Sequence, residues 1–250
     1  MKHTDIPTII VDQYKKASTS VDSLNTYKDL TIHALPGLHE YLFELIRKQC
    51  TKGSHILELA AGSGAMSLRL KDHGFEVDAT DYVVENFKLG NVISFKQADL
   101  NGNFSNSYDV KFDGIMASEI IEHLENPRNF ARQCFKLLKP GGKLILSTPN
   151  IDSGSSIASY IRTGMHEHFN DKNYRHDGHI TPLMQWVIEK SFSEAGFSFV
   201  FRGSFGDGFA RLQGSPRLIL LAKLINLISN RSPDLLNQIF VAVVSKPKVF

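Results

Sequence analysis

The sequence is poor in the features that assign a protein to a class at first sight. Its two cysteines, Cys50 and Cys134, lie far apart and without metal or redox spacing, so we expect free thiols in a reducing compartment. The formal net charge is only +2, which gives no strong overall attraction to nucleic acid. No apolar stretch is long enough to span a bilayer, and residues 1–16 lack the apolar core of a secretion signal. These absences favour a cytoplasmic protein.

The stretch from residue 55 to residue 70 organises the rest of the chain. An apolar run over residues 56–59 is typical of a buried parallel strand. The small-residue turn that follows contains Gly62 and Gly64, which can adopt positive φ and let a ligand approach the backbone. A helical pattern then begins at Met66, and the free N–H groups of its first turn would face that ligand. The stretch predicts a strand–turn–helix that binds a cofactor.

The residues around this turn favour a cationic cofactor over a dinucleotide. A dinucleotide fingerprint would have a third glycine where Ser67 stands. Glu58, at the end of the strand, suits a ligand with an ammonium or sulfonium group. An acidic residue followed by a glycine-rich turn resembles the first motif of the class I S-adenosylmethionine-dependent methyltransferases. That family usually has glycine where Ala60 stands, and the resemblance places Ala60 in the cofactor-binding turn.

Two further acidic residues follow predicted strands at positions that suit a nucleoside. Asp81 ends a strand over residues 75–81, at the distance from the glycines where an acid accepts hydrogen bonds from ribose. The alternative is an ordinary cap for the segment that begins at Tyr82, whose ring could otherwise cover the adenine. The resemblance implies that Asp99 meets the adenine amino group and that Leu100 supplies an apolar edge.

The order of the predicted strands matches the same family. The run over residues 112–150 is similar to its ubiquinone-pathway and sugar-modifying O-methyltransferase branches. The resemblance covers residues 36–150 and implies an α/β, Rossmann-like sheet of seven strands, mostly parallel with the last antiparallel, and helices on both faces. After the strand at residues 75–81, we expect five more, over residues 92–96, 112–118, 143–150, 197–201 and 239–245.

We expect one domain over residues 1–250, because 42% of its residues are hydrophobic and can fill a large core. By the resemblance, residues 1–35 form a leader over the cofactor and residues 36–150 form the cofactor-binding core. Residues 151–181 and 202–236 would be insertions on the substrate side that form a cap. Within the first insertion, residues 151–180 show no clear periodicity and predict a loop.

The second insertion contains an apolar helical pattern with two interpretations. Residues 216–228 are apolar on nearly every face. They lie within residues 202–231, which contain five basic residues and one acid. One interpretation is a buried cap or a homodimer helix. The other is an anchor toward a membrane surface or a lipid-linked substrate.

The candidate catalytic residues follow the strand that ends at Ser118, which we place at the cofactor edge. Glu119, Glu122 and His123 would share one face if this segment were helical. His123 is our main candidate for the base, since imidazole titrates near neutrality. His179 is the second candidate for the acceptor site. The alternative is that the two carboxylates are solvated or cap a helix and that His123 packs structurally.

A metal site is a further hypothesis, which we do not favour. Two carboxylates and an imidazole could hold a divalent ion, as related patterns do in some small-RNA ribose methyltransferases. The residues that could complete such a site are His166, Glu167, His168, His176 and His179. Their spacing is not diagnostic, and the same residues could bond to backbone or water.

These observations leave four functions open. The favoured one is methyl transfer from S-adenosylmethionine to a hydroxyl of a small molecule, with a saccharide or a lipid-linked intermediate among the candidates. The others are a nicotinamide-dependent oxidoreductase, a non-catalytic S-adenosylmethionine-binding module and an RNA ribose O-methyltransferase. Near-neutral charge disfavours the last, and the missing third glycine disfavours the oxidoreductase. The sequence does not identify the acceptor.

Overall fold

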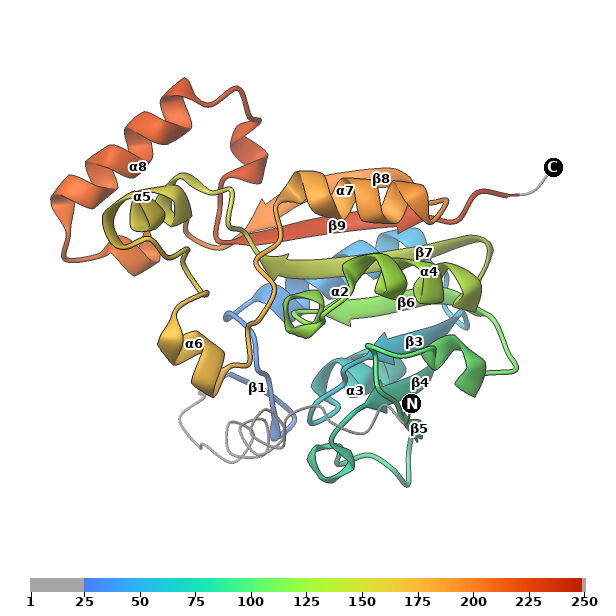
Figure 1. Ribbon diagram of the computed structural model, residues 1–250. Coiled ribbons are helices and arrows are strands. Elements are labelled where there is room, and N and C mark those ends of the chain that lie inside the picture. The colour runs from blue at the N-terminus through green and yellow to red at the C-terminus, as the bar shows by residue number, and fades with distance from the viewer. Residues whose placement is uncertain (1–24, 249–250) are drawn as a thin grey trace, which may run out of the picture.

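A seven-stranded sheet forms the centre of the computed structural model, which describes residues 25–248 (Figure 1). The strand order is β5-β4-β3-β6-β7-β9-β8. The strands are β3 (His55–Leu59), β4 (Glu76–Asp81), β5 (Ser94–Gln97), β6 (Phe112–Ser118), β7 (Leu138–Pro149), β8 (Ser198–Phe205) and β9 (Ile239–Ser245). A separate hairpin, β1 (Thr26–Tyr27) and β2 (Leu30–Thr31), precedes the sheet.

The sheet is parallel except for β9, which lies antiparallel between β7 and β8. The central strands β3 and β6 are buried on both faces, which is why their sequences are almost continuously apolar. The predicted Rossmann-like methyltransferase sheet, with its last strand antiparallel, is therefore confirmed.

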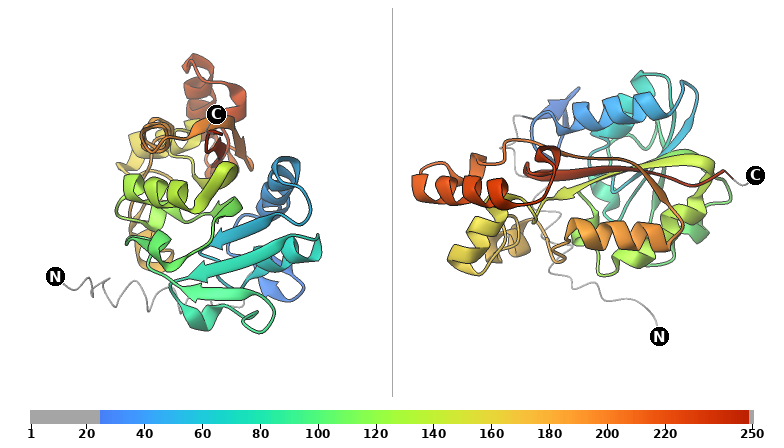
Figure 2. Two further views of the ribbon diagram at one scale, coloured as in Figure 1. Left: turned by 90° about the vertical axis from the view of Figure 1, so that its right-hand side faces the viewer. Right: turned by 90° about the horizontal axis from the view of Figure 1, so that it is seen from above.

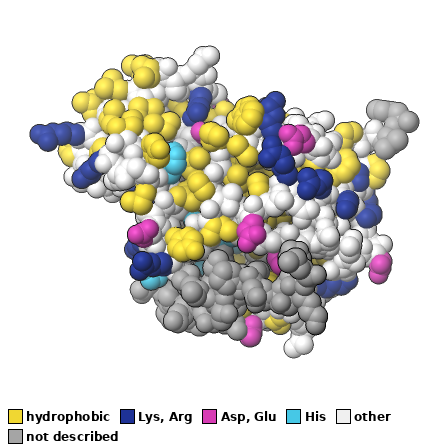
Figure 3. All heavy atoms as spheres, viewed as in Figure 1, with side chains coloured by type: hydrophobic (Ala, Val, Ile, Leu, Met, Phe, Trp, Pro, Cys, Tyr) yellow, Lys and Arg dark blue, Asp and Glu magenta, His cyan; other side chains and the backbone are white. Residues whose placement is uncertain are grey.

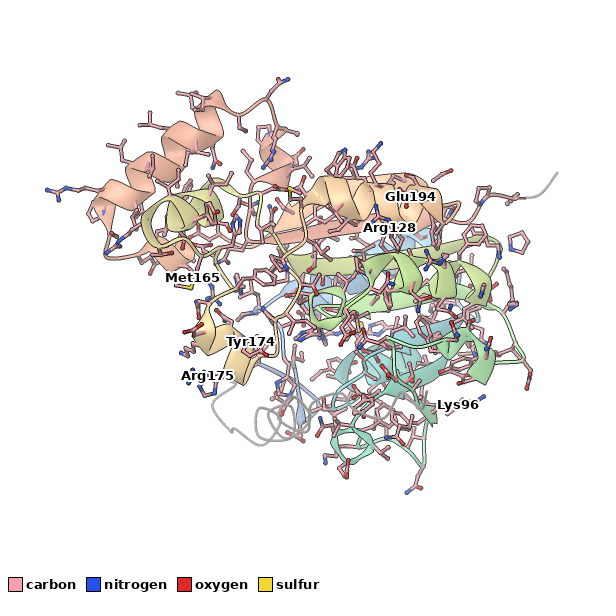
Figure 4. The ribbon with its side chains drawn as sticks, in the orientation of Figure 1. Lys96, Arg128, Met165, Tyr174, Arg175 and Glu194 are labelled. Atoms are coloured by element: carbon pink, nitrogen blue, oxygen red, sulfur yellow. The ribbon has the colours of Figure 1, made fainter. Side chains whose placement is uncertain are left out.

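Helices cover both faces of the sheet (Figure 2). On one face, α2 (Leu38–Gln49) and α3 (Ala65–Asp72) contribute buried Leu42 and Met66 to a core with Ile145. On the other, α4 (Pro127–Leu137) and α7 (Gln185–Glu194) pack through residues that include Phe130 and Phe192. Arg128 of α4 and Glu194 of α7 also pair at the surface at 2.9 Å (Figure 4).

The predicted loop over residues 151–180 is wrong in part, because two helices lie within it. These are α5 (Gly154–Thr163) and α6 (Asp171–His176). Side chains of Ser153 and Asn170 cap them by accepting backbone N–H groups. The residues that make the segment look irregular are therefore partly capping residues. The following helix, α7, begins at Gln185, and before it Thr181 donates its hydroxyl to the Leu124 carbonyl within an extended segment.

The helix α8 (Pro216–Ile228) packs on α5 beyond the carboxyl ends of β6 and β7 (Figure 1). Gly154 makes this contact close: a Cβ there would lie 2.5 Å from the carbonyl oxygen of Ala222. Within the described residues, Ala222 is the only fully buried residue of α8. The interpretation of α8 as a buried cap helix is therefore wrong for most of the helix surface. No helix within residues 25–248 has both the length and the apolar character needed to cross a membrane.

Candidate active site

A cavity of about 460 Å³ opens at the carboxyl ends of the central strands. Its wall contains residues from β3, β4 and β6 and from the segments that follow these strands. Two of the predicted site residues, Gly64 and Glu122, lie outside the wall. The predicted residues within it are Glu58, Ala60, Gly62, Asp81, Tyr82, Asp99, Leu100, Ser118, Glu119, His123 and His179.

The turn after β3 is held by Asp81 at the end of β4. The Gly62 N–H donates to one carboxylate oxygen of Asp81 at 2.8 Å, and the Val83 N–H donates to the other at 2.8 Å. Asp81 therefore caps backbone N–H groups, as one of the two interpretations held, and it also lines the cavity. Each carboxylate oxygen retains a lone pair, so ribose hydroxyls can add to these bonds. Burial raises the pKa of Asp81, while the backbone donors act against that rise.

Two positions of the turn differ from the simplest expectation. Ala60 has φ 56°, a left-handed conformation in which a Cβ is unfavourable, which explains why glycine is usual there. Gly64 has φ 93°, and a Cβ on it would lie 2.8 Å from Leu89 and 2.9 Å from Phe87. Side chains of this protein thus press against Gly64, where we expected the ligand.

Glu58 lies beneath the turn as a buried carboxyl group. The hydroxyl of Ser67 donates to it from the first turns of α3. Burial raises the pKa of Glu58 to about 8, against the effect of the Ser67 hydrogen bond. A sulfonium or ammonium group arriving nearby would favour the ionised form, because an opposite charge lowers the pKa of a carboxyl group.

The predicted adenine end of the cavity lies beyond Asp81. Tyr82 is 39% exposed and its carbonyl accepts a hydrogen bond of 2.9 Å from Gln97. Asp99 accepts the N–H of Asn101 at 2.9 Å, which fixes the turn after β5. Leu100 is buried beside them and supplies an apolar wall.

The segment before α2 also reaches the cavity, a contribution that sequence reasoning did not resolve by residue. Thr31, His33, Ala34 and Leu35 line it, and the Ser63 hydroxyl donates to the Thr31 carbonyl at 2.6 Å. Burial lowers the pKa of His33, and the charge of Asp81 opposes this. Residues 1–24 of the predicted leader lie outside the described residues, so that leader stays a prediction.

The segment after β6 is not an α-helix, so the shared helical face considered for Glu119, Glu122 and His123 does not form. Glu119 has φ 49°, and its N–H donates to the carbonyl of Ser147 at 3.2 Å. Only Ile121–His123 forms a short 3₁₀ turn. Glu122 is fully buried, accepts the Thr148 hydroxyl at 2.9 Å and does not itself line the cavity.

Burial changes the assignment of acid and base in this segment. It raises the pKa of Glu119 to about 7, and it raises that of Glu122 further, since the charge of Glu119 adds to the effect. Burial lowers the pKa of His123 to about 3, and the charge of His179 acts in the same direction. This lowered pKa disfavours His123 as a base that titrates near neutrality, and its role in the reaction stays a prediction. Glu119 titrates near neutrality instead.

The imidazole of His123 is oriented by its neighbours. Its Nδ1 lies 3.1 Å from the Gly178 carbonyl oxygen, and its ring meets that of His179 edge-on at 4.9 Å between centroids. His179 Nδ1 in turn lies 2.8 Å from the carbonyl oxygen of His168. These contacts bring together two of the predicted catalytic residues from distant segments.

Three further residues lie at this end of the cavity: His168, which the sequence offered only for the metal hypothesis, and Asp177 and Arg211, which it did not single out. His168 has φ 65° and is 8% exposed, and its Nε2 has no hydrogen-bond partner among the described residues. Asp177 and Arg211 also line the cavity, and Arg211 is the only Lys or Arg among the described residues of the cavity wall. Arg211 lies far from the other two in the sequence, so only the folded chain reveals this grouping.

Three of the residues considered for a metal site lie close together in the structure. Glu122, His123 and His179 offer ligand atoms that lie within 4.8 Å of one another. Glu122 Oε1 is buried without a hydrogen-bond partner in the described part of the chain, and an O,N,N donor set suits a divalent cation. His166 and Glu167 instead pair with Ser156 at 3.0 Å and Ser155 at 2.9 Å.

Sequence comparison with known proteins identifies relatives of this chain. A sequence model described as a methyltransferase domain matches residues 33–200. A ubiquinone biosynthesis O-methyltransferase of Coxiella burnetii (strain Dugway 5J108-111) is 30% identical over 156 residues, 57% of this chain and 65% of that protein. A mitochondrial enzyme of the same name from Rattus norvegicus is 31% identical over 39% of this chain and 31% of its own. The chain thus spans less than two thirds of the length of these relatives.

Solved structures extend the likeness to most of the chain. A methyltransferase dependent on S-adenosylmethionine from Archaeoglobus fulgidus matches with a TM-score of 0.60 and 17% identity, over 84% of this chain and 93% of that one. The phosphoethanolamine N-methyltransferase 2 of Haemonchus contortus, in complex with S-adenosyl-L-methionine, matches with a TM-score of 0.57 and 13% identity, over 84% of this chain and 53% of that one.

Proposed function

This chain belongs to the methyltransferase-domain family, whose cofactor is S-adenosylmethionine, and we propose that it methylates a hydroxyl group of a small molecule. The observation that carries the proposal is Glu119, a carboxyl group in the cavity wall with a pKa of about 7. Such a group is about half ionised near neutrality and can take a proton from a hydroxyl.

The cofactor fits the side of the cavity formed by the turn after β3. Asp81 would accept the ribose hydroxyls, and Glu58 would balance the positive charge of the methionine part. Tyr82, Asp99 and Leu100 would enclose the adenine. Because the sulfonium already activates the methyl group, the protein needs mainly to align the reactants and exclude water.

The acceptor fits the opposite side, among Glu119, His168, His179 and Arg211. In the proposed step the acceptor oxygen forms a bond to the methyl carbon while the carbon–sulfur bond breaks. The hydroxyl proton passes to the Glu119 carboxylate. The products are a methyl ether and S-adenosylhomocysteine, and Glu119 later releases the proton to solvent. Neutral His123 would orient the acceptor by a hydrogen bond.

A small acceptor suits the charge of the cavity better than RNA. Its wall carries six carboxyl-bearing residues and one guanidinium, Arg211, within the described residues; the six are Glu58, Asp81, Asp99, Glu119, Glu125 and Asp177. A polyanion would be repelled by such a wall. A lipid-linked acceptor is the finer proposal, supported by the apolar helix α8 next to η4 (Ala210–Leu212), which contributes Arg211.

A divalent ion is a second proposal at the same site, supported by the unpartnered Oε1 of Glu122. Glu122, His123 and His179 would hold it. When bound, such an ion would contact the acceptor oxygen and lower the pKa of its hydroxyl.

Calorimetry followed by product analysis tests the proposed function. We expect binding of S-adenosylmethionine and S-adenosylhomocysteine, no binding of NAD, and a mass gain of one methyl group on a hydroxylated acceptor. Binding of NAD alone would contradict the family cofactor. Cofactor binding without turnover on a broad panel of hydroxylated small molecules, together with methylation of RNA, would contradict the acceptor class.

A further inference from the structure

The outer face of α8 is an exposed stripe of large aliphatic side chains. Leu220, Leu224, Leu227 and Ile228 are 60%, 49%, 79% and 81% exposed. Their spacing places them on one side of the helix. The other side, which includes Ala222, packs against α5 and the preceding segment. A soluble protein rarely leaves such a stripe uncovered unless it meets a partner or a membrane.

Further exposed apolar side chains lie at and just after the end of α5. Tyr160, Ile161 and Met165 are exposed there. Yellow apolar side chains gather over α5 and α8 in Figure 3, and Figure 4 shows Met165 near the end of α5, at the end of the molecule that also carries Tyr174 and Arg175. We call the exposed apolar residues of α5 and α8, with Met165, the α5–α8 surface.

In the two segments that carry this surface, residues 153–166 and 208–233, the charged side chains are all basic, and neither segment contains Asp or Glu. Arg162, Arg217 and Lys223 are exposed within them, and Lys223 Nζ lies 5.8 Å from the centre of the Phe209 ring. An apolar stripe flanked by basic residues is the pattern of a helix that lies in the headgroup region of an anionic membrane.

We propose that the α5–α8 surface docks on the surface of an anionic phospholipid bilayer. The leucines and Ile228 enter the boundary between headgroups and acyl chains, and the three cations contact lipid phosphates. A second copy of this chain is a poorer partner, because a symmetric contact would bring the same cations together without acidic residues to pair them.

The α5–α8 surface is connected to the cavity through the segment that precedes α8. The segment η4 precedes α8, and its Leu212 packs in the small core shared by α5 and α8. The neighbouring Arg211 lines the cavity. The docking surface is therefore linked through one short segment to the acceptor side of the cavity, so a hydroxylated acceptor that resides in a bilayer would have a short path to it.

Vesicle flotation with the full chain tests the proposal without any enzymatic assay. We expect the protein to float with vesicles of phosphatidylcholine containing about a third phosphatidylglycerol, and to bind pure phosphatidylcholine at least about tenfold more weakly. Added salt should weaken the binding. The variant L224S/L227S/I228S should lose binding by about tenfold or more, because exposed apolar side chains supply the insertion energy.

Charge variants separate the two contributions. R217E/K223E should bind anionic vesicles much more weakly, while the matched control K136E, an exposed lysine on α4, should bind like the original protein. V92S/V110S, at exposed valines outside the surface, controls for general loss of apolar area. Calorimetry with S-adenosylmethionine on each variant confirms that the cavity is intact.

Two outcomes would overturn the proposal. One is the absence of vesicle binding by protein that still binds its cofactor. The other is a concentration-dependent dimer, seen by sedimentation, that L224S/L227S/I228S abolishes while vesicle binding is equal in all variants. The second result would identify the surface as an interface between copies.

Discussion

The Ser67 hydroxyl donates a hydrogen bond to the buried carboxyl group of Glu58, at the position where a dinucleotide-binding turn would have its third glycine. The departure from that fingerprint is thus a specific polar contact. It joins α3 to the end of β3 and gives the cavity an ionisable group with a pKa of about 8.

The raised pKa of Glu58 predicts how stability depends on pH. A carboxyl group whose pKa is higher in the folded than in the unfolded state binds an extra proton when folded, so stability falls as pH rises toward the folded value. Unfolded histidine still binds protons near its ordinary pKa of about 6.5, so the buried His123 and His168, with folded pKa values of about 3, oppose this fall below about pH 7.5. Between about pH 7.5 and 8 these histidines are neutral in both states, while Glu58, with a folded pKa of about 8, still gives up its proton on unfolding. We expect the melting temperature of the free protein to fall across this window.

Glu58→Gln should flatten that fall, measured by thermal unfolding at closely spaced pH values. The exposed Glu125→Gln is the control and should leave the slope unchanged. A flat profile for the original protein, or the same slope for Glu58→Gln, would contradict a buried carboxyl group that is protonated near neutrality.

Asp81→Ala should weaken binding of S-adenosylmethionine by about 10–100-fold, since hydrogen bonds to a charged acceptor contribute about 1.5–3 kcal/mol. The change also removes the acceptor of the Gly62 and Val83 N–H groups. Titration calorimetry measures the effect, and Asp109→Ala, in an exposed segment, should bind normally. Unchanged affinity in Asp81→Ala would remove this carboxylate from the cofactor site.

Glu119→Gln should lower turnover by about 10²–10⁴-fold while cofactor affinity stays near that of the original protein, because the amide cannot take a proton. In the original protein, kcat should fall as pH drops below about 7, as the carboxylate is protonated. His123→Asn should lower turnover less and leave this pH profile in place, since burial keeps its imidazole neutral. A profile that persists in Glu119→Gln would assign the titration to another group.

Chelation separates the two versions of the proposed chemistry. If an ion helps, treatment with a chelator should abolish turnover, Mg²⁺ or Zn²⁺ should restore it, and Glu122→Gln should weaken metal binding measured by calorimetry. Full activity after chelation, with no metal found by elemental analysis, would contradict the metal proposal and leave Glu119 as the only proposed group that promotes loss of the acceptor proton.

Gly154→Val should destabilise the α5–α8 contact by about 1–3 kcal/mol, because the added side chain would overlap the backbone of Ala222. Thermal unfolding measures this loss. Gly90→Ala is the control, since a Cβ at Gly90 meets nothing within 4 Å. A melting temperature for Gly154→Val like that of the control would show that α8 has room to shift away from α5.

The sequence predicted the sheet well because each buried strand is an apolar run bounded by turn residues. It also predicted that Glu58, Gly62 and Asp81 lie at one edge of the sheet, because they stand at or just after the ends of the neighbouring strands β3 and β4, and all three line the cavity. Local pattern does not show how deeply a side chain is buried, and burial lowers the pKa of His123 to about 3 and raises that of Glu119 to about 7.

The acceptor side could not be predicted from local pattern. His168 and Arg211 reach the cavity from segments on either side of β8, through packing of α5 and α8. The polar composition of residues 151–180 also concealed two helices, because the Ser and Asn residues that suggest a loop serve as caps.

The position of β9 in the sheet has a consequence for how the chain is made. The edge strand β8 pairs only with β9, which is synthesised after it and after the whole of α8. During synthesis, β8 therefore emerges from the ribosome before β9, the strand with which it pairs. This edge of the sheet can form only after Ile239–Ser245 has also emerged. During this interval the nascent chain presents an open strand and the apolar α8 together, a stage at which chaperone assistance would matter most.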